Sequence, residues 1–263
     1  MLAIGSSPLI KLSVNINKVA TIRNSRGGTT PSVLDAAKVC VDAGAPGITV
    51  HPRADERHIT GADVRDLSRF LQAMNSTRAA AGMGHGVEYN IEGDPRPDFL
   101  ALVHEVRPTQ CTLVPVRPGE ITSQAGWPAD TPREFIGRVV RELRDAGTRV
   151  SLFVDPDLDA VRWAADLGAD RVELYTEPFA RAFQQGEARA WQAFDRYARA
   201  ATEAHAAGLG VNAGHDLDLD NLVLFRTLPH LEEVSIGHAL ISHALFVGLE
   251  HSVREYLAVL GPQ

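Results

Sequence analysis

The chain has 263 residues, of which 44% are hydrophobic and 22% are charged, and its formal net charge is -7. This length fits one α/β barrel of roughly 250 residues as well as two smaller domains, and the composition excludes a disordered chain. An acidic balance without a basic block argues against a nucleic-acid partner. No apolar run reaches the ~18 residues that a membrane span needs.

Two features predict a cytoplasmic location. The opening residues MLAIGSSPLI lack the basic start and the long apolar stretch of a signal peptide. The two cysteines, Cys40 and Cys111, are too few for a disulfide scaffold or a cysteine-based zinc site, and they suit a reducing compartment. We therefore expect a cytoplasmic protein without a membrane partner.

Short apolar runs, each followed by a helical stretch, repeat along the whole chain. Their β-branched residues and largely continuous hydrophobicity are typical of parallel strands that are covered on both faces. Four of the runs follow a glycine that suits the left-handed turn at the end of a helix. The predicted strands are residues 12–17, 47–51, 87–92, 110–115, 149–155, 171–175, 209–214 and 233–237.

Eight such units without a break in composition favour an α/β fold, a (β/α)8 TIM barrel that forms one domain over residues 1–263. An open doubly wound sheet is the alternative. It is disfavoured because the glycine-rich stretch 82–86 precedes a strand, whereas a dinucleotide-binding motif lies between a strand and a helix. Residues 76–86 are expected to form a loose surface loop, and residues 177–190 an insertion after the sixth strand.

Several local signals predict where helices begin. The pairs at 30–31, 131–132 and 155–156 each place Thr or Asp before proline, which is typical of an N-cap followed by the first helical residue. Thr131 with Glu134 predicts a capping box, and Thr60 with Asp63 predicts a weaker one.

Polar side chains end the apolar runs of at least five predicted strands, where a barrel of this kind carries its chemistry. Core packing alone predicts no such convergence. His51 directly follows GITV, so its ring is expected over the barrel mouth, the end formed by the carboxyl ends of the strands. The alternative is a histidine that is hydrogen-bonded to a neighbouring loop.

Glu92 ends the third predicted strand and shares one strand face with Asn90, because strand side chains alternate with a period of two. If that face points inward, Glu92 lies at the lip of an apolar barrel. Desolvation there raises a carboxyl pKa towards that of a useful general base. The alternative is a rim glutamate that is paired with an arginine.

Two regions are candidates for binding anionic groups. The stretches 212–215 and 236–239 combine glycine with histidine at the seventh and eighth strands, and a helix is expected directly afterwards. Backbone N–H groups and a helix N-terminus bind phosphate at this place in many barrels. Arg26 and Arg53 would supply guanidinium groups for a second anion.

Other chemistries lack their residues. No HxH or HExxH spacing offers a metal site, and GxSxG is absent. The alternating Asp216, Asp218 and Asp220 lack the glycine and glutamate of a calcium loop. A Schiff-base aldolase needs a buried inner lysine, whereas only Lys18 lies near a strand end.

Seven stretches in the same order resemble the pyridoxine 5'-phosphate synthase family of vitamin B6 biosynthesis, from about residue 11 onward. They are SVNINKVATIRNSRGG, GITVHPRADERHIT, YNIEGDP, LVPVRPGEITSQAGW, VSLFVDPD, GLGVNAGHDL and SIGHALISHALFVGL. The resemblance implies a (β/α)8 barrel with additional helices, assembled as a homo-octamer from a tetramer of dimers. It also implies that 3-amino-2-oxopropyl phosphate condenses with 1-deoxy-D-xylulose 5-phosphate to give pyridoxine 5'-phosphate, phosphate and water, without metal or organic cofactor.

The resemblance also assigns roles to individual residues. His51 and Glu92 match the family's proton acceptors, and His215 matches its proton donor. The residues that match contacts to 3-amino-2-oxopropyl phosphate are Asn15, Gly237 and His238. Those that match contacts to 1-deoxy-D-xylulose 5-phosphate are Arg53, His58 and Thr122, and Arg26 matches a further binding arginine.

Three positions depart from the pattern of many family members. Asn17 and Lys18 stand where many have Asp-His, at positions that touch deoxyxylulose phosphate. Asn17 keeps a hydrogen-bonding oxygen without the charge, and Lys18 can still neutralise phosphate. Asp216 stands where many have glycine, which is tolerable if only its backbone N–H binds phosphate. These departures concern binding more than the type of reaction.

Two other classes of function stay open at this point. One is a different phosphosugar isomerase or aldolase on the same barrel. Assays with a panel of phosphosugars, compared with turnover of the B6 precursors, distinguish the two activities. The other is a phosphate-binding barrel without catalysis, which binds these ligands and does not convert them.

Overall fold

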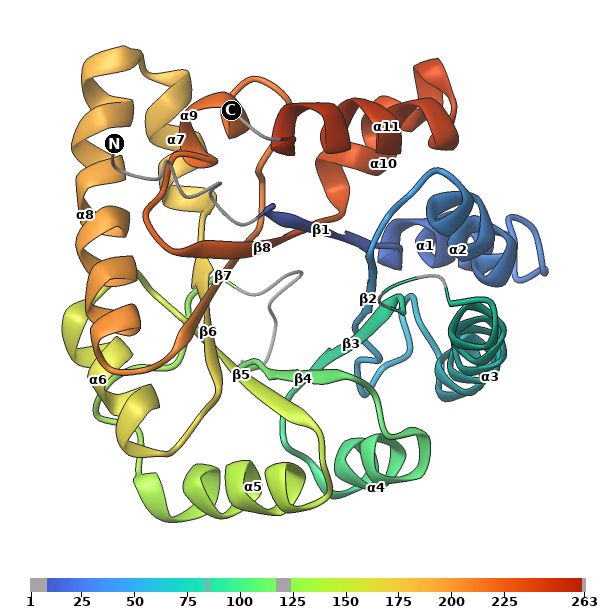
Figure 1. Ribbon diagram of the computed structural model, residues 1–263, viewed down its shortest axis with the longest axis horizontal. Helices are drawn as coiled ribbons and strands as arrows, with labels where there is room; N and C mark the ends of the chain where they lie inside the picture. The colour runs from blue at the N-terminus through green and yellow to red at the C-terminus, as the bar shows by residue number, and fades with distance from the viewer. Residues whose placement is uncertain (1–8, 83, 85, 117–123, 262–263) are drawn as a thin grey trace.

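The structure, a computed structural model, describes residues 9–82, 84, 86–116 and 124–261. Eight parallel strands close into one barrel in chain order, with helices around it, so the predicted α/β class and (β/α)8 barrel are confirmed (Figure 1). The strands are β1 (Lys11–Asn15), β2 (Gly47–Val50), β3 (Glu88–Gly93), β4 (Gln110–Leu113), β5 (Arg149–Val154), β6 (Arg171–Tyr175), β7 (Gly210–Gly214) and β8 (Leu231–Ile236).

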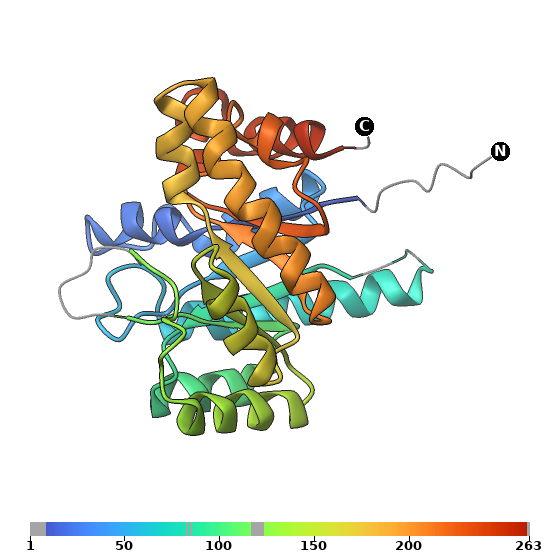
Figure 2. The same ribbon diagram turned by 90° about the vertical axis from the view of Figure 1, so that its left-hand side faces the viewer.

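Helices cover the outside of the barrel, and Figure 2 shows one of the longest, α8, crossing in front of the strands. Several strands are followed by more than one helix, which agrees with the expected additional helices. The helices are α1 (Asn17–Asn24), α2 (Val33–Asp42), α3 (Gly61–Ala80), α4 (Pro97–Val106), α5 (Arg133–Asp145), α6 (Leu158–Asp166), α7 (Glu177–Gln184), α8 (Glu187–Ala206), α9 (Leu222–Phe225), α10 (His238–Val247) and α11 (Leu249–Leu260). In the described residues no helix is both long and apolar enough to cross a membrane.

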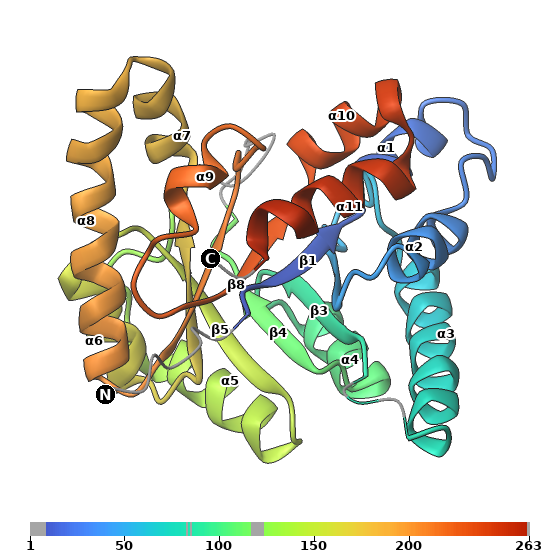
Figure 3. The ribbon, with the colours of Figure 1, turned by 45° about the horizontal axis from the view of Figure 1, so that its top comes forward.

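The hydrophobic core lies between the strands and the helices. Successive side chains of a strand point to opposite faces, so each strand directs one set of residues at the helices. Val14, Ile91 and Leu152 belong to this outward set, and none of them is exposed. The last two helices, α10 and α11, pack on each other beside β1 and close this layer after the eighth strand (Figure 3).

The interior of the barrel is polar, which corrects the expectation of an apolar barrel. Asn212 on β7 donates to Gln110 on β4 at 3.5 Å, and these strands are not neighbours, so the bond crosses the interior. The strand sequences alternate polar and apolar residues with a period of two, so they differ from the largely continuous apolar runs that we predict from the sequence. The buried inward residues include Ser13, Thr49, Asn90, Gln110, Thr112, Ser151, Glu173, Asn212, Glu233 and Ser235.

Helix starts were predicted less well than strands. The Thr60–Asp63 capping box is complete in both directions. The three pairs that end in proline are not N-caps, because α2 is capped by Ser32 and α6 by Asp157. Helix α5 begins after Pro132 without a side-chain cap, so the predicted Thr131–Glu134 box is wrong. The proline stands directly before the cap in α2 and α6 and is itself the N-cap residue of α5, so none of the three lies inside the first turn.

Two connecting segments also differ from expectation. The predicted loop at 76–86 is helical as far as Ala80, because α3 continues through alanines that favour helix. The insertion at 177–190 is present, and it forms α7 and the first turn of α8. Strand β1 ends at Asn15 rather than at residue 17, since the Asn15 side chain accepts the N–H of Asn17 and turns the chain into α1.

Gly93 at the end of β3 tests how tightly the barrel packs on its helices. A Cβ at this position would lie 2.3 Å from the ring of Phe99, which is only 1% exposed. We expect Gly93→Ala to lower the free energy of unfolding in urea by roughly 1–3 kcal/mol through overpacking. The control is Gly28→Ala, where a Cβ meets nothing within 4 Å. A change of more than about 0.5 kcal/mol in the control, or an equal loss in both variants, would contradict this explanation.

Candidate active site

A pocket of about 420 Å³ lies at the barrel mouth, where the carboxyl ends of the strands meet. It gathers residues that are far apart in the sequence, from the ends of β1, β2, β3, β6, β7 and β8. Among the predicted site residues that the structure describes, eleven line it: Asn15, Asn17, Lys18, His51, Arg53, His58, Glu92, His215, Asp216, Gly237 and His238.

The two remaining predicted residues are Arg26 and Thr122. Arg26 is exposed in the turn after α1 and does not line this pocket, so its binding role stays a prediction. Thr122 lies outside the described residues.

Asparagine side chains tie the first three strands together at the pocket. The Nδ2 of Asn15 donates to the Glu92 carboxylate at 3.4 Å. The Oδ1 of Asn17 accepts the backbone N–H of His51 at 2.9 Å. Asn17 therefore positions His51 with its oxygen and has only its NH₂ group left for a ligand. This bond needs only a side-chain oxygen, which asparagine supplies as aspartate would.

His51 and Glu92 form a buried, uncharged pair. The His51 Nδ1 and a Glu92 carboxylate oxygen are 4.0 Å apart. Burial holds the pKa of His51 well below its usual value, and burial followed by the charge of Glu233 raises the pKa of Glu92 to about 8. Near pH 7 the imidazole is therefore neutral and the carboxyl largely keeps its proton. The Nε2 of His51 is buried without a hydrogen-bond partner in the described residues, so one ring nitrogen remains for a ligand.

The desolvated Glu92 has a pKa close enough to neutrality to exchange protons, so it is a candidate for proton transfer. Its contacts within the described residues are with Asn15, His51 and Ser235, none of which is the arginine of the alternative interpretation. The raised pKa of Glu92 has a second cause besides burial, which is the negative charge of Glu233. A carboxyl with a pKa near neutrality accepts and returns protons efficiently.

Glu173 on β6 is a candidate functional residue that the sequence interpretation missed. It lines the pocket and is only 2% exposed. Burial, followed by the charges of Glu92 and Glu233, raises its pKa well above the usual range. The available signal was the alternation in RVELY, where Glu173 shares a face with Tyr175 and Arg171. Ser235 on β8, another lining residue, follows the same pattern.

His215 lies directly after β7 with two aromatic rings against its imidazole. The ring centroids of Phe153 and Tyr175 are 5.2 Å and 5.5 Å from that of His215. Burial lowers the pKa of His215. Its backbone has φ of 82°, and that of Asp216 has φ of 57°, both in the left-handed region that side chains disfavour.

Each end of the pocket suits an anionic group. Beside β8, Gly237 precedes α10, and the first N–H groups of a helix lack intrahelical partners and attract anions. A Cβ at Gly237 would lie 3.0 Å from the Cβ of Asn15, so the close approach of these strands needs glycine. Beside β2, the pocket is lined by Arg53, which is 8% exposed, and by Lys18.

His58 completes the β2 side of the pocket. Its Nδ1 accepts the backbone N–H of Ile59 at 2.9 Å, which leaves Nε2 for a ligand. Burial followed by the charge of Arg53 lowers the pKa of His58 to about 4, so the ring is neutral near pH 7. The cationic groups at this end are therefore Arg53 and Lys18, with His58 as a neutral hydrogen-bonding group.

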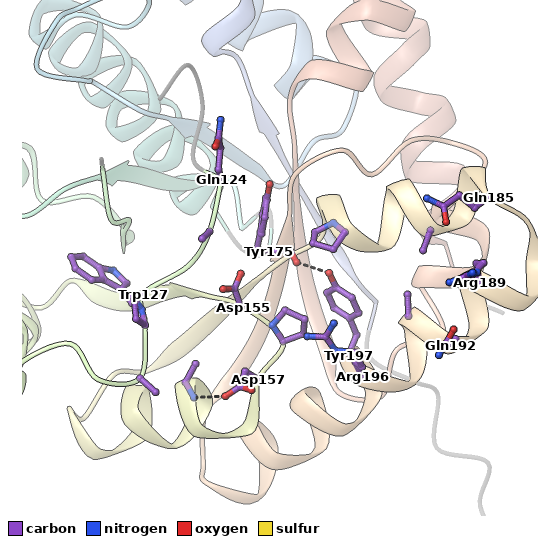
Figure 4. Close-up of a pocket in the computed structure, with 18 residues that line it drawn as sticks. Gln124, Trp127, Asp155, Asp157, Tyr175, Gln185, Arg189, Gln192, Arg196 and Tyr197 are labelled. Carbon is purple, nitrogen blue, oxygen red and sulfur yellow. Dashed lines mark hydrogen bonds between the residues drawn. The ribbon is translucent and has the colours of Figure 1, made fainter. Parts of the chain in front are cut away.

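A larger cavity of about 670 Å³ lies beside the mouth pocket, between α7, α8 and the segment that begins at Gln124 (Figure 4). None of the predicted site residues that the structure describes lines it. Its arginines, Arg189 and Arg196, are exposed and are balanced by the carboxylates of Asp155 and Asp157. The smaller mouth pocket, which combines buried titratable groups with anion-binding ends, is therefore the better candidate for catalysis. Within the described residues no group of three or more metal-ligating side chains is placed to hold an ion.

The buried carboxyls predict how stability depends on pH. The pKa of Glu92 is raised to about 8 and that of Glu233 to about 7, whereas an unfolded glutamate has a pKa of about 4.3. The folded state therefore holds protons that the unfolded chain has released, and this contribution is lost as the pH rises through the folded pKa values. Histidines with lowered pKa are neutral in both states above about pH 7 and do not oppose the trend.

We expect the free energy of unfolding in urea to fall between pH 7 and pH 8, by at most about 1.4 kcal/mol per pH unit for each proton involved. Glu92→Gln should weaken this fall, because the amide does not titrate. The control is Glu134→Gln, which changes an exposed glutamate in the first turn of α5. An unchanged pH dependence in Glu92→Gln would show that Glu92 does not carry the raised pKa.

Comparison with known proteins agrees with this geometry. Residues 12–261 match the family described as Pyridoxal phosphate biosynthesis protein PdxJ. The chain is 51% identical over 254 residues to the pyridoxine 5'-phosphate synthase of Leptospira biflexa, covering 96% of this chain and 97% of that protein. The corresponding enzyme of Porphyromonas gingivalis is 49% identical over 249 residues, with 94% and 98% covered.

A solved structure of tryptophan synthase from M. tuberculosis has a TM-score of 0.57 over 95% of this chain and 92% of that chain. Its sequence identity is only 13%, so it supports the barrel fold alone. The family match spans nearly the whole chain, and both curated relatives are about half identical to it over nearly their full lengths. The protein therefore belongs to the family described as Pyridoxal phosphate biosynthesis protein PdxJ.

Proposed function

We propose that this chain acts as a pyridoxine 5'-phosphate synthase, which condenses 3-amino-2-oxopropyl phosphate with 1-deoxy-D-xylulose 5-phosphate. The products are pyridoxine 5'-phosphate, inorganic phosphate and water. Relatives at about half identity carry this name. The observation that carries the proposal is the buried pair of His51 and Glu92 between two anion-binding ends of one pocket.

Two phosphorylated substrates need two anion sites, and the ends of the pocket supply them. We assign 3-amino-2-oxopropyl phosphate to the end formed by Asn15, Gly237 and His238, where the N–H groups of α10 suit phosphate. We assign 1-deoxy-D-xylulose 5-phosphate to the opposite end, with Arg53 and Lys18 as its cationic groups. The further proposed contacts at that end are Asn17 and His58, together with Thr122.

The proposed reaction consists of proton transfers around bonds that form and break within the substrates. The substrate amine attacks a carbonyl and water leaves, so no lysine of the protein is needed. The neutral His51 accepts protons on one side, and Glu92, with its pKa near neutrality, accepts them and passes them on. His215, from the far side of the pocket, donates a proton to a leaving oxygen.

Asp216 and Arg26 have particular places in this proposal. Asp216 lines the pocket with φ of 57°, and its backbone N–H rather than its carboxylate is the proposed phosphate contact. Arg26 is exposed outside the pocket, so we propose that its binding role arises only in the assembled homo-octamer, a tetramer of dimers. We also retain one domain and a cytoplasmic location as proposals, with Cys40 and Cys111 both buried and unpaired.

A direct assay tests the proposal against its alternatives. The purified protein is incubated with both substrates, and formation of pyridoxine 5'-phosphate is followed by its fluorescence. Turnover of a different phosphosugar in a panel, without this product, would favour an isomerase or aldolase. Binding of both substrates without any product would favour a phosphate-binding barrel.

Glu92→Gln is expected to lower turnover by ~10²–10⁴, because the amide keeps the size of the side chain and does not accept a proton. Substrate binding should change little. His215→Asn is expected to lose turnover in the same way, and Glu134→Gln on the outside of α5 serves as the matched control. Steady-state kinetics and calorimetric binding check both quantities. Near-normal turnover in Glu92→Gln would make the carboxyl a structural group.

Arg53→Ala is expected to weaken binding of 1-deoxy-D-xylulose 5-phosphate more than binding of 3-amino-2-oxopropyl phosphate. A lost charge-assisted hydrogen bond to phosphate costs about 1.5–3 kcal/mol, or roughly a tenfold to 150-fold weaker affinity. Arg189→Ala, in the larger side cavity, is the control with the same change of charge. Equal losses for both substrates would show that the two anion sites are assigned wrongly.

A further inference from the structure

The backbone at His215 and Asp216 needs an explanation, because two successive residues other than glycine have φ of 82° and 57°. Each left-handed residue of this kind costs on the order of 1–2 kcal/mol relative to the right-handed conformation. Such a conformation persists only where neighbouring groups hold it. The two peptide groups on either side of the His215 Cα atom must therefore be restrained by neighbouring residues.

Thr176, the residue that follows β6, supplies these contacts. Its hydroxyl donates to the carbonyl of Gly214 at 2.5 Å and also lies within hydrogen-bond distance of the carbonyl of His215. Its backbone N–H donates to the same Gly214 carbonyl at 2.9 Å. The two carbonyls belong to the peptides before and after the His215 Cα, so one hydroxyl between them restrains both φ and ψ of His215.

The ordinary role of a threonine at this position does not account for its hydroxyl. Thr176 is the N-cap residue of α7, where a threonine side chain commonly accepts a backbone N–H of the first turn. In this structure its side chain makes no capping hydrogen bond. The side chain is fully buried, and its hydroxyl is directed at the loop after β7 instead.

The position of Thr176 is itself held from outside the barrel. The hydroxyl of Tyr197 on α8 donates to the backbone carbonyl of Tyr175 at 2.6 Å, as Figure 4 shows. Tyr175 directly precedes Thr176, and its ring lies edge-on to the His215 imidazole. The end of β6 therefore holds His215 twice, through its backbone by Thr176 and through its ring by Tyr175.

We propose that Thr176 is a positioning residue for His215, and that its hydroxyl keeps His215 in the left-handed conformation that directs the imidazole into the mouth pocket. This inference rests on the proposed function, in which His215 donates a proton. Thr176 itself does not line the pocket, so it acts through His215 rather than on the substrate. Loss of the hydroxyl leaves the Gly214 carbonyl with the Thr176 backbone N–H alone and removes the Thr176 contact of the His215 carbonyl, so the loop can relax.

The test compares Thr176→Val, which replaces the hydroxyl with a methyl group of similar size, with Thr176→Ser, which keeps the hydroxyl. We expect Thr176→Val to lower kcat by about tenfold to a hundredfold, because small displacements of a catalytic group have effects of this size. KM should change much less. The pH profile of kcat should shift on the limb that is missing from the profile of His215→Asn. Thr176→Ser should restore kcat to within about threefold of the original protein.

Thr148→Val is the matched control, because Thr148 is also buried but lies at the opposite end of the barrel, before β5. It should leave kcat unchanged. The proposal is overturned if Thr176→Val keeps normal kcat while His215→Asn is inactive, or if Thr176→Ser loses as much activity as Thr176→Val. If the valine variant does not fold, Thr176→Ala takes its place in the same comparison with serine.

A crystal structure of Thr176→Val separates failure of this inference from failure of the proposed function. The expected result is a His215 backbone outside the left-handed region, with its ring moved from Tyr175. An unchanged His215 overturns the positioning role whatever the kinetics show. Normal turnover in His215→Asn instead contradicts the proposed proton donor, and the conformation of His215 in the valine variant then decides the positioning role by itself.

Discussion

Glu92 is buried in the barrel mouth beside His51 and shares the interior with the carboxyls of Glu233 and Glu173. Carboxyl groups withdrawn from water and close to one another cannot all ionise, so their pKa values rise. This constraint keeps a proton available near neutral pH where His51 is uncharged. The chemistry proposed for the pocket depends on it, and so does the expected loss of stability above pH 7.

Alternation along the strands makes this burial compatible with a stable barrel. The outward residues form an apolar layer with the helices, while the inward residues form a hydrogen-bonded polar interior in which Asn212 reaches Gln110 across the barrel. Buried polar groups are costly without partners. Most of the interior groups have partners here, so the outer core stabilises the fold and the inner side chains can serve the site.

The mouth pocket also depends on backbone that the rest of the fold holds in place. Asn17 accepts the N–H of His51, and the residues at the end of β6 restrain the left-handed turn at His215. Strained residues of this kind are often found at functional sites, where stability is exchanged for a defined geometry. The candidate catalytic residues therefore lie at the ends of strands. Residues at the ends of other strands make the hydrogen bonds and ring contacts that orient them.

The sequence by itself determined the eight strands, their order and most residues of the pocket, because apolar runs and the polar residues that end them are local signals. His51, Glu92 and His215 were found in this way. The local sequence does not show which face of a strand points into the barrel. Glu173 and the polar interior could therefore not be predicted, because closure of the barrel decides this orientation. Helix starts near proline were misplaced by one or two residues, since several nearby side chains compete to cap them. Only the tertiary structure decided the raised pKa values of the buried carboxyls, the position of Arg26 outside the mouth pocket and the hydrogen bonds of Thr176 to the loop at His215. Each depends on which residues from distant strands become neighbours.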